Sequence, residues 1–208
     1  RGLISSEEVR YGLRILIGVL LGAAILIGLL GNPIAGTLLG LSVGYSLLMY
    51  REFFIPEFLD ARPFFYAATH QVIIIPIYAF ATATAVPEAA FTRPVLWFAM
   101  TGLGASFALE VCRKLDPEAH PALRTYLTVS GPGRTATAVA ASVLLAVYGA
   151  YKIGVFAIMG PVTLVLLASL VLTMARPTRF KWTAGFAGLF VLAQVFAPTI
   201  AHIVGMLS

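Results

Sequence analysis

The stretch FALEVCRKLDPEAHPALRTYLTVSGPGR, residues 107–134, organises the rest of the chain. It begins as the end of an apolar helix and continues as a segment with many charged residues. The segments on either side contain almost no charged residues. Seven of the chain's 23 charged residues (14 basic plus 9 acidic) fall in this window: Glu110, Arg113, Lys114, Asp116, Glu118, Arg124 and Arg134. Charged groups at the end of a membrane helix are costly to place there, so this window is a candidate functional site.

Two interpretations of the window are open. In a helix, Glu110 faces Arg113 at i+3 and Lys114 at i+4. The first interpretation is an ordinary helix end, at which Glu110 is merely paired with these bases and the bases anchor the helix at the membrane surface. The second is a site in which the same groups contact a ligand. Spacing alone does not separate the two.

Composition places the chain in the membrane. It is 60% hydrophobic and 11% charged, with a mean hydropathy of +0.94, which exceeds what a soluble domain of 208 residues needs. The net charge of +5 is no sign of nucleic-acid binding, because the basic residues flank apolar segments. The single cysteine, Cys112, excludes an internal disulfide and a cysteine-rich metal site. The chain begins at Arg1 without a signal-peptide pattern, so we expect it to be truncated or processed at that end.

Seven apolar segments are bounded by glycine, proline or charge, and none shows the period-2 alternation of a barrel strand. Because helices satisfy their own backbone groups in lipid, the sequence predicts an all-α polytopic membrane protein with a single transmembrane domain. Ser5 and Glu8 have the spacing of a capping box, and Gly31, Asn32 and Pro33 stop the first helix. The expected spans are about residues 8–30, 34–50, 63–86, 94–114, 134–151, 153–175 and 180–207.

The basic residues predict the orientation of these spans. Alternate connections carry 12 of the 14 basic residues, which leaves only Arg93 and Lys152 for the opposite side. By the positive-inside rule, the N-terminus is then cytoplasmic and the C-terminus lies across the cell (inner) membrane. The cytoplasmic connections are also the long ones, so a site is expected on that face.

Polar and kinking residues inside the spans suggest a cavity. His70 and Gln71 lie about a third of the way into the third span, at the depth expected for Glu110 in the fourth. A lone membrane histidine is more often bonded to a neighbouring helix, but these groups could also line one cavity beneath the cytoplasmic loops. Pro76 and Pro161, like Pro198 in the last span, are expected to kink their helices, and such kinks often open cavities. Gln194 is expected to be a packing contact.

The central window and its flanks resemble a divergent branch of the UbiA-type intramembrane prenyltransferase superfamily. The stretch after that family's sixth span carries an acidic motif followed by a threonine and a glycine at similar spacing. Residues 1–5 resemble the segment before the family's third span, and Tyr50, Arg51, His70 and Gln71 fall near its fourth and fifth spans. The residues that carry the resemblance in the window are Glu110-Val111-Cys112-Arg113-Lys114, Pro117-Glu118, Thr125-Tyr126 and Gly131.

The resemblance implies a nine-helix bundle with a cytoplasmic site. The seven spans here would correspond to spans three to nine, so the first two spans and the family's first acidic motif are expected to be missing. It further implies transfer of an isoprenoid chain from a prenyl diphosphate to an acceptor in the bilayer, with Mg²⁺ as cofactor and no nucleic acid as partner. With half of the metal site missing, we expect the 208-residue chain alone to be inactive.

The site residues follow from this resemblance. We expect Glu110, His70 and Gln71 to be catalytic, and Glu110 with Asp116 to be the metal ligands. The family's motif places carboxylates one turn apart, whereas Glu110 has a base at i+4 and the next acid only at i+6. That departure allows the bases to contact diphosphate without a metal. The expected diphosphate-binding residues are Arg51, Arg113, Lys114, Arg124 and Tyr126.

Two other classes of function remain open at this point. The chain could be a small-molecule or lipid transporter, or a binding protein that uses the same cavity without chemistry, although no inverted repeat is visible in the sequence. It could also be an inactive homologue that keeps the fold to bind lipid.

Overall fold

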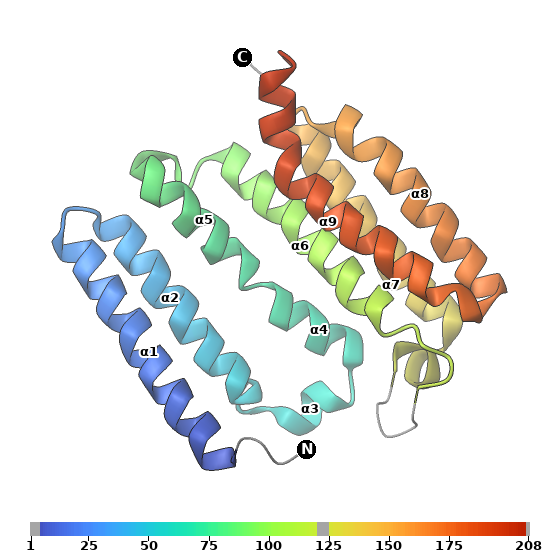
Figure 1. The fold of residues 1–208 in the computed structure, drawn as a ribbon, viewed down its shortest axis with the longest axis horizontal. Coiled ribbons are helices and arrows are strands. Elements are labelled where there is room, and N and C mark those ends of the chain that lie inside the picture. The colour runs from blue at the N-terminus through green and yellow to red at the C-terminus, as the bar shows by residue number, and fades with distance from the viewer. Residues whose placement is uncertain (1–4, 120–124, 207–208) are drawn as a thin grey trace.

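The computed structural model describes residues 5–119 and 125–206, and Figure 1 shows a bundle of helices. The long helices are α1 (Ser6–Leu29), α2 (Pro33–Tyr50), α4 (Pro63–Gln71), α5 (Ile74–Ala85), α6 (Arg93–Arg113), α7 (Tyr126–Lys152), α8 (Phe156–Ala175) and α9 (Phe180–Ile203). The short ones are η1 (Glu52–Phe54), α3 (Pro56–Asp60), η2 (Pro87–Ala89) and η4 (Pro177–Arg179). With α4 and α5 as one interrupted span, seven helices of the described residues are long and apolar enough to cross a membrane. The prediction of an all-helical chain with seven such spans is confirmed.

Sequence signals at the helix ends act as expected. The Ser5 backbone N–H donates to the Glu8 carboxylate over 2.7 Å, and the Glu8 N–H donates to the Ser5 hydroxyl over 3.2 Å, which is a complete capping box. At the next turn, Gly31 has a φ of +106°, and the Asn32 side-chain oxygen accepts from the Ala35 N–H. The Asn32 amide also donates to the Ala83 carbonyl over 2.8 Å, which ties the α1–α2 turn to α5.

The third span is interrupted where its proline predicts. α4 ends at Gln71 and α5 begins at Ile74, so the break includes Val72, the residue four positions before Pro76. A proline lacks the N–H that would bond this carbonyl and its ring clashes with it, so the helix breaks one turn before the proline. The helices α8 and α9 continue through Pro161 and Pro198, so the kinks expected there stay predictions.

Helix α6 is the element on which the two parts of the fold meet. On one side α1 packs on α2, α2 on α5 and α5 on α6; on the other, α6, α7, α8 and α9 pack in a bundle in which α6 contacts both α7 and α9 (Figure 1). The larger of the two apolar cores belongs to this bundle, and a smaller one lies between α2 and α5.

Two glycines bring α6 and α7 into close contact. A Cβ on Gly104 would lie 2.8 Å from the backbone nitrogen of Ala146, and one on Gly149 would lie 2.8 Å from the carbonyl oxygen of Trp97. Each helix therefore offers a glycine against the other's backbone, the small-residue packing that lets helices approach in lipid. The apolar residues of α7 and α8 that face away from the core, such as Leu144 and Leu164, are exposed and would face lipid.

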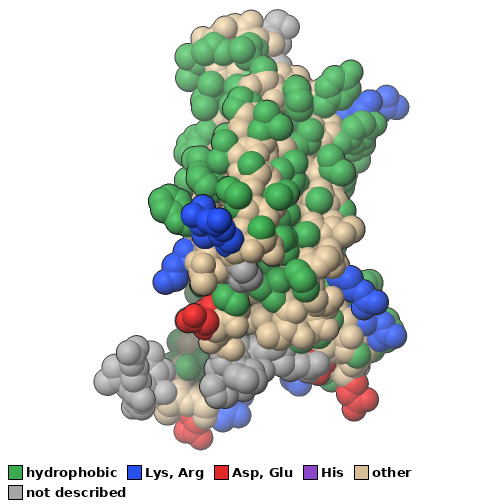
Figure 2. Space-filling model, turned by 90° about the vertical axis from the view of Figure 1, so that its right-hand side faces the viewer, with side chains coloured by type: hydrophobic (Ala, Val, Ile, Leu, Met, Phe, Trp, Pro, Cys, Tyr) green, Lys and Arg blue, Asp and Glu red, His purple; other side chains and the backbone are tan. Residues whose placement is uncertain are grey.

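The charged residues gather at one end of the bundle, called here the basic end. It holds the first turns of α1, α4, α7 and α9 and the last turns of α2, α6 and α8. Among the described basic residues, only Arg93 and Lys152 lie at the opposite end, where α6 begins and α7 ends. Figure 2 shows hydrophobic side chains along the body of one face and most of the Lys, Arg, Asp and Glu side chains in its lower half. This distribution is that of a multi-pass membrane protein.

Candidate active site

A cavity of about 600 Å³ lies at the basic end, in contact with α3, and is called here the α3 cavity. Its walls come from the α2–α4 connection, the first turns of α4 and α7, and the residue that follows α6. Acidic, basic, tyrosine and apolar side chains all contribute to it: Glu52, Pro56, Glu57, Leu59, Asp60, Pro63, Tyr66, Lys114, Tyr126 and Val129. Mixed linings of this kind, at the end of an apolar bundle, suit a ligand with a polar head and an apolar tail.

A left-handed turn places the acidic wall. Glu52, Phe53 and Phe54 have φ values of +48°, +53° and +60°, although none of them is glycine. This conformation costs roughly 1–2 kcal/mol per residue, so it persists only where packing holds it. The ring of Phe53 supplies such packing, because it lies edge-on to Tyr45 at 5.4 Å and to His70 at 5.9 Å between ring centroids. The turn redirects the chain after α2 and lays α3 along the cavity.

The first turns of α4 supply an aromatic wall. Tyr66 lines the cavity, and its ring stacks on that of His70 with centroids 4.2 Å apart. The His70 Nδ1 lies 2.9 Å from the Tyr66 carbonyl oxygen, one turn back in the same helix. Phe64 stacks on Tyr126 at 5.3 Å, which joins α4 to α7. His70 thus supports the position of the Tyr66 ring and has local partners of its own.

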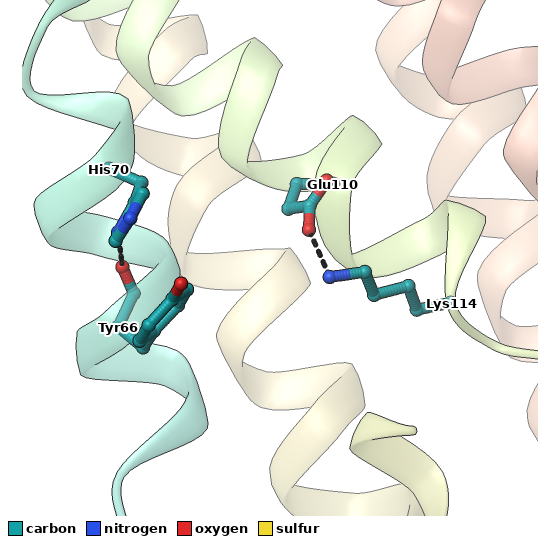
Figure 3. Close-up of polar contacts among 4 residues, drawn as sticks. All are labelled: Tyr66, His70, Glu110 and Lys114. Atoms are coloured by element: carbon teal, nitrogen blue, oxygen red, sulfur yellow. Dashed lines mark hydrogen bonds and ion pairs between the residues drawn. The ribbon is translucent and has the colours of Figure 1, made fainter. Parts of the chain in front are cut away.

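The end of α6 is followed by Lys114, the one lysine among the described residues of the cavity lining. The Lys114 Nζ lies 2.6 Å from the Glu110 Oε1, and 5.7 Å from the centre of the Tyr126 ring. Figure 3 shows this pair on α6 opposite the Tyr66 and His70 rings on α4. The lysine side chain is 54% exposed and the glutamate 26%, so the pair itself adds little stability. Its effect is positional, because Glu110 keeps the ammonium group at the cavity wall.

The start of α7 holds Tyr126 in place. Thr125 caps the helix by accepting from the Thr128 N–H, and the Thr135 hydroxyl donates to the carbonyls of Tyr126 and Gly131 over 3.1 and 2.8 Å. Gly131 has a φ of +77°, which bends the helix there. The fifth span is expected to begin at about residue 134. Helix α7 begins at Tyr126, but its backbone leaves the helical conformation at Gly131, so the uninterrupted helix begins next to the expected position and a short helical segment precedes it.

The structure brings together some of the predicted site residues and separates others. Lys114 and Tyr126 line the cavity, and Glu110 reaches it through its ion pair. His70 lies behind the Tyr66 ring, Gln71 is the last residue of α4, and the described cavity lining includes neither of them. Arg51 and Arg113 are exposed and lie outside the same lining, while Arg124 lies outside the described residues. His70 and Glu110, which are expected at the same depth, each have a local partner: the Tyr66 carbonyl for His70 and Lys114 for Glu110.

The expected metal ligands do not fit a magnesium site. Glu110 already pairs with Lys114, and Asp116 accepts a hydrogen bond from the Glu118 backbone N–H over 2.9 Å. Within residues 5–119 and 125–206, no three His, Cys, Asp or Glu side chains come together in a way that could hold a metal ion. The Glu110 Oε1 thus contacts a lysine ammonium group, and Asp116 accepts from the backbone of its own loop.

Sequence reasoning missed four polar residues of the cavity lining. The sequence predicts His70 as a site residue of this helix. Tyr66, one turn before it, is the aromatic residue that lines the cavity. The acids Glu52, Glu57 and Asp60 all fall in the 12-residue connection after α2. Three acidic residues in one short connection at the basic end could have indicated a site in this connection. Their orientation towards the cavity, however, depends on the left-handed turn.

Comparison with protein-family models, with curated proteins and with solved structures finds no match to this chain.

Proposed function

We propose that this chain binds an isoprenoid diphosphate in the α3 cavity and is the part of a UbiA-type intramembrane prenyltransferase that holds the head of this ligand. The observation that carries the proposal is the meeting of Lys114, Tyr66 and Tyr126 in a cavity at the charged end of an apolar bundle. A prenyl diphosphate has an anionic head and an apolar tail. The lysine and the tyrosine hydroxyls are donors for the head, and the apolar spans offer a medium for the tail.

In this proposal, the charges of the lining favour one position of the head within the cavity. Glu52, Glu57 and Asp60 on the α2–α4 connection would repel a diphosphate, whereas Lys114 attracts it. The head is therefore placed against the end of α6 and the start of α7, away from the acidic wall. The resemblance to the UbiA type supports the class of ligand, and in this proposal Lys114, which Glu110 holds at the cavity wall, supplies the positive charge for the head.

In this proposal, one wall of the cavity stabilises the leaving diphosphate and the other accepts the proton of the acceptor. The carbon–oxygen bond between the prenyl chain and the diphosphate breaks, and its electron pair leaves with the diphosphate, where the Lys114 ammonium stabilises the added charge. The acceptor forms its new bond to the prenyl carbon and loses a proton. The carboxylates of Glu52 and Glu57 line the opposite wall and are the bases available to take that proton.

The proposal also fixes an orientation. The basic end, with the α3 cavity, faces the cytoplasm of a cell membrane by the positive-inside rule. A charged diphosphate in the cytoplasm then reaches the cavity without crossing the bilayer.

One binding experiment tests ligand and orientation together. The chain is produced in a bacterial host, and radiolabelled geranylgeranyl diphosphate is added to inverted vesicles and to right-side-out vesicles, with vesicles from the empty host as control. Saturable binding is expected in inverted vesicles only. Competition is expected from unlabelled geranylgeranyl diphosphate and its thiodiphosphate analogue, but not from geranylgeraniol, because the head supplies the charge-assisted contacts. Equal competition by the alcohol, or release of the probe into the vesicle lumen as in transport, would contradict the proposal.

A further inference from the structure

The α2–α4 connection exposes apolar side chains on the side that faces away from the α3 cavity. Phe54 is 72% exposed, Ile55 45% and Phe58 44%, and these three residues are called here the outer face of α3. At 100° per residue, Phe58 projects from the opposite side of α3 to Pro56 and Asp60, which line the cavity. A connection outside the seven spans thus carries aromatic side chains that neither core of the fold uses.

The outer face is continuous with the surface of a membrane span. The Phe58 ring contacts the Phe65 ring edge-on at 5.7 Å, and Phe65 belongs to the first turns of α4 and is 49% exposed. Since α4 begins a span, its exposed apolar surface faces lipid. The aromatic surface therefore runs without interruption from the span onto α3, at the level where the span leaves the bilayer.

Two arginines frame this surface. The Arg62 guanidinium lies 3.9 Å above the Phe58 ring, and its Nη1 donates to the Phe58 carbonyl over 3.3 Å. Arg51 is exposed at the other end of the connection, where α2 ends. Aromatic rings with long basic side chains beside them are the composition of the membrane–water interface, where rings lie at headgroup level and guanidinium groups reach lipid phosphates.

We propose that the outer face of α3 is inserted into the headgroup region of the bilayer, with Arg51 and Arg62 against anionic lipid phosphates. A five-residue helix cannot span the membrane, so it lies in the interface between the ends of α2 and α4. The bilayer then holds α3 in place from outside while Glu57 and Asp60 face the cavity from inside. This inference stands on the exposed surface alone and does not depend on the ligand of the cavity.

Spin labels measure the depth of α3 directly. The single cysteine, Cys112, is buried and is replaced by alanine, after which Phe58→Cys, Phe54→Cys, Glu57→Cys and Glu118→Cys are labelled in separate proteins. In nanodiscs that contain anionic lipid, collision with oxygen relative to a water-soluble nickel chelate should be severalfold higher at positions 54 and 58 than at 118. Position 57, on the same helix but the cavity side, is the matched control and should resemble 118.

Each other outcome of this measurement contradicts the proposal. Labels at 54 and 58 that are as accessible to nickel as the one at 118 would place the outer face in water. Labels shielded from both reagents would show that a protein surface, such as a second copy of the chain, covers it. Arg62→Gln should move the label at 58 towards water in anionic nanodiscs, whereas Arg179→Gln, on the α8–α9 connection, should leave it unchanged.

Discussion

Replacing Lys114 by glutamine should weaken binding of a prenyl diphosphate about 10- to 100-fold, since a hydrogen bond from a charged donor contributes roughly 1.5–3 kcal/mol and each 1.4 kcal/mol is tenfold in affinity. The lysine is the basic residue of the described cavity lining, and its loss also leaves the Glu110 carboxylate without its partner. Both changes act against an anionic head. The dissociation constant of geranylgeranyl diphosphate in nanodiscs is the quantity to measure.

Two further variants separate this effect from general charge loss. Arg113→Gln removes the same charge one residue earlier, from an exposed side chain outside the described lining, and should leave affinity within about twofold, as expected for a screened surface charge. The double variant Glu110→Gln with Lys114→Gln should recover part of the loss, because it removes the carboxylate that repels the head. Wild-type affinity in Lys114→Gln would remove Lys114 from the proposed site.

Replacing Gly104 by alanine should have the largest effect on stability. The added Cβ would lie 2.8 Å from the backbone nitrogen of Ala146 and 3.1 Å from its Cβ, and backbone atoms cannot move aside as a flexible side chain can. Helices α6 and α7 must then separate, at a cost of about 1–3 kcal/mol or more, as for other overpacked sites. The free energy of unfolding in mixed detergent micelles measures this cost.

Gly188 in α9 provides the matched control. A Cβ there meets no atom within 4 Å, so Gly188→Ala should be neutral or slightly stabilising, as alanine is the better helix former. Equal effects of the two substitutions would show that α6 and α7 are not packed through Gly104.

The spans were predictable because each of their signals is local. A capping box at Ser5, a stop at Gly31 to Pro33 and a proline at position 76 act within one or two turns, and each marks a boundary or break in the structure. Hydropathy and the alternation of basic connections then suffice for the number of spans. Gly131 and Pro132 indicate an interruption, and the backbone of α7 is non-helical at Gly131; the short helical segment before it, which begins at Tyr126 and is bonded across the bend by Thr135, was not predicted.

The site was predictable only in part, because its geometry depends on which of several possible partners each side chain contacts in the folded chain. The spacing of Glu110 and Lys114 allowed either an ion pair or a metal ligand, and the structure shows the ion pair. The acidic wall depends on a left-handed turn at Glu52 to Phe54 that contains no glycine, so no local propensity indicates it. Packing of Phe53 between Tyr45 and His70, which are distant in sequence, stabilises that turn.

Photoaffinity labelling tests the central claim, that the α3 cavity binds the diphosphate head, most directly. A prenyl diphosphate analogue with a diazirine next to the head group is bound in nanodiscs and irradiated, and the labelled peptides are identified by mass spectrometry. The expected label lies at Lys114, at Tyr66 and in residues 126–129, the walls nearest the proposed position of the head, and disappears with excess unlabelled diphosphate ligand. Competed label in the α1–α2 hairpin or at the opposite end of the bundle, with none on the cavity walls, would contradict it.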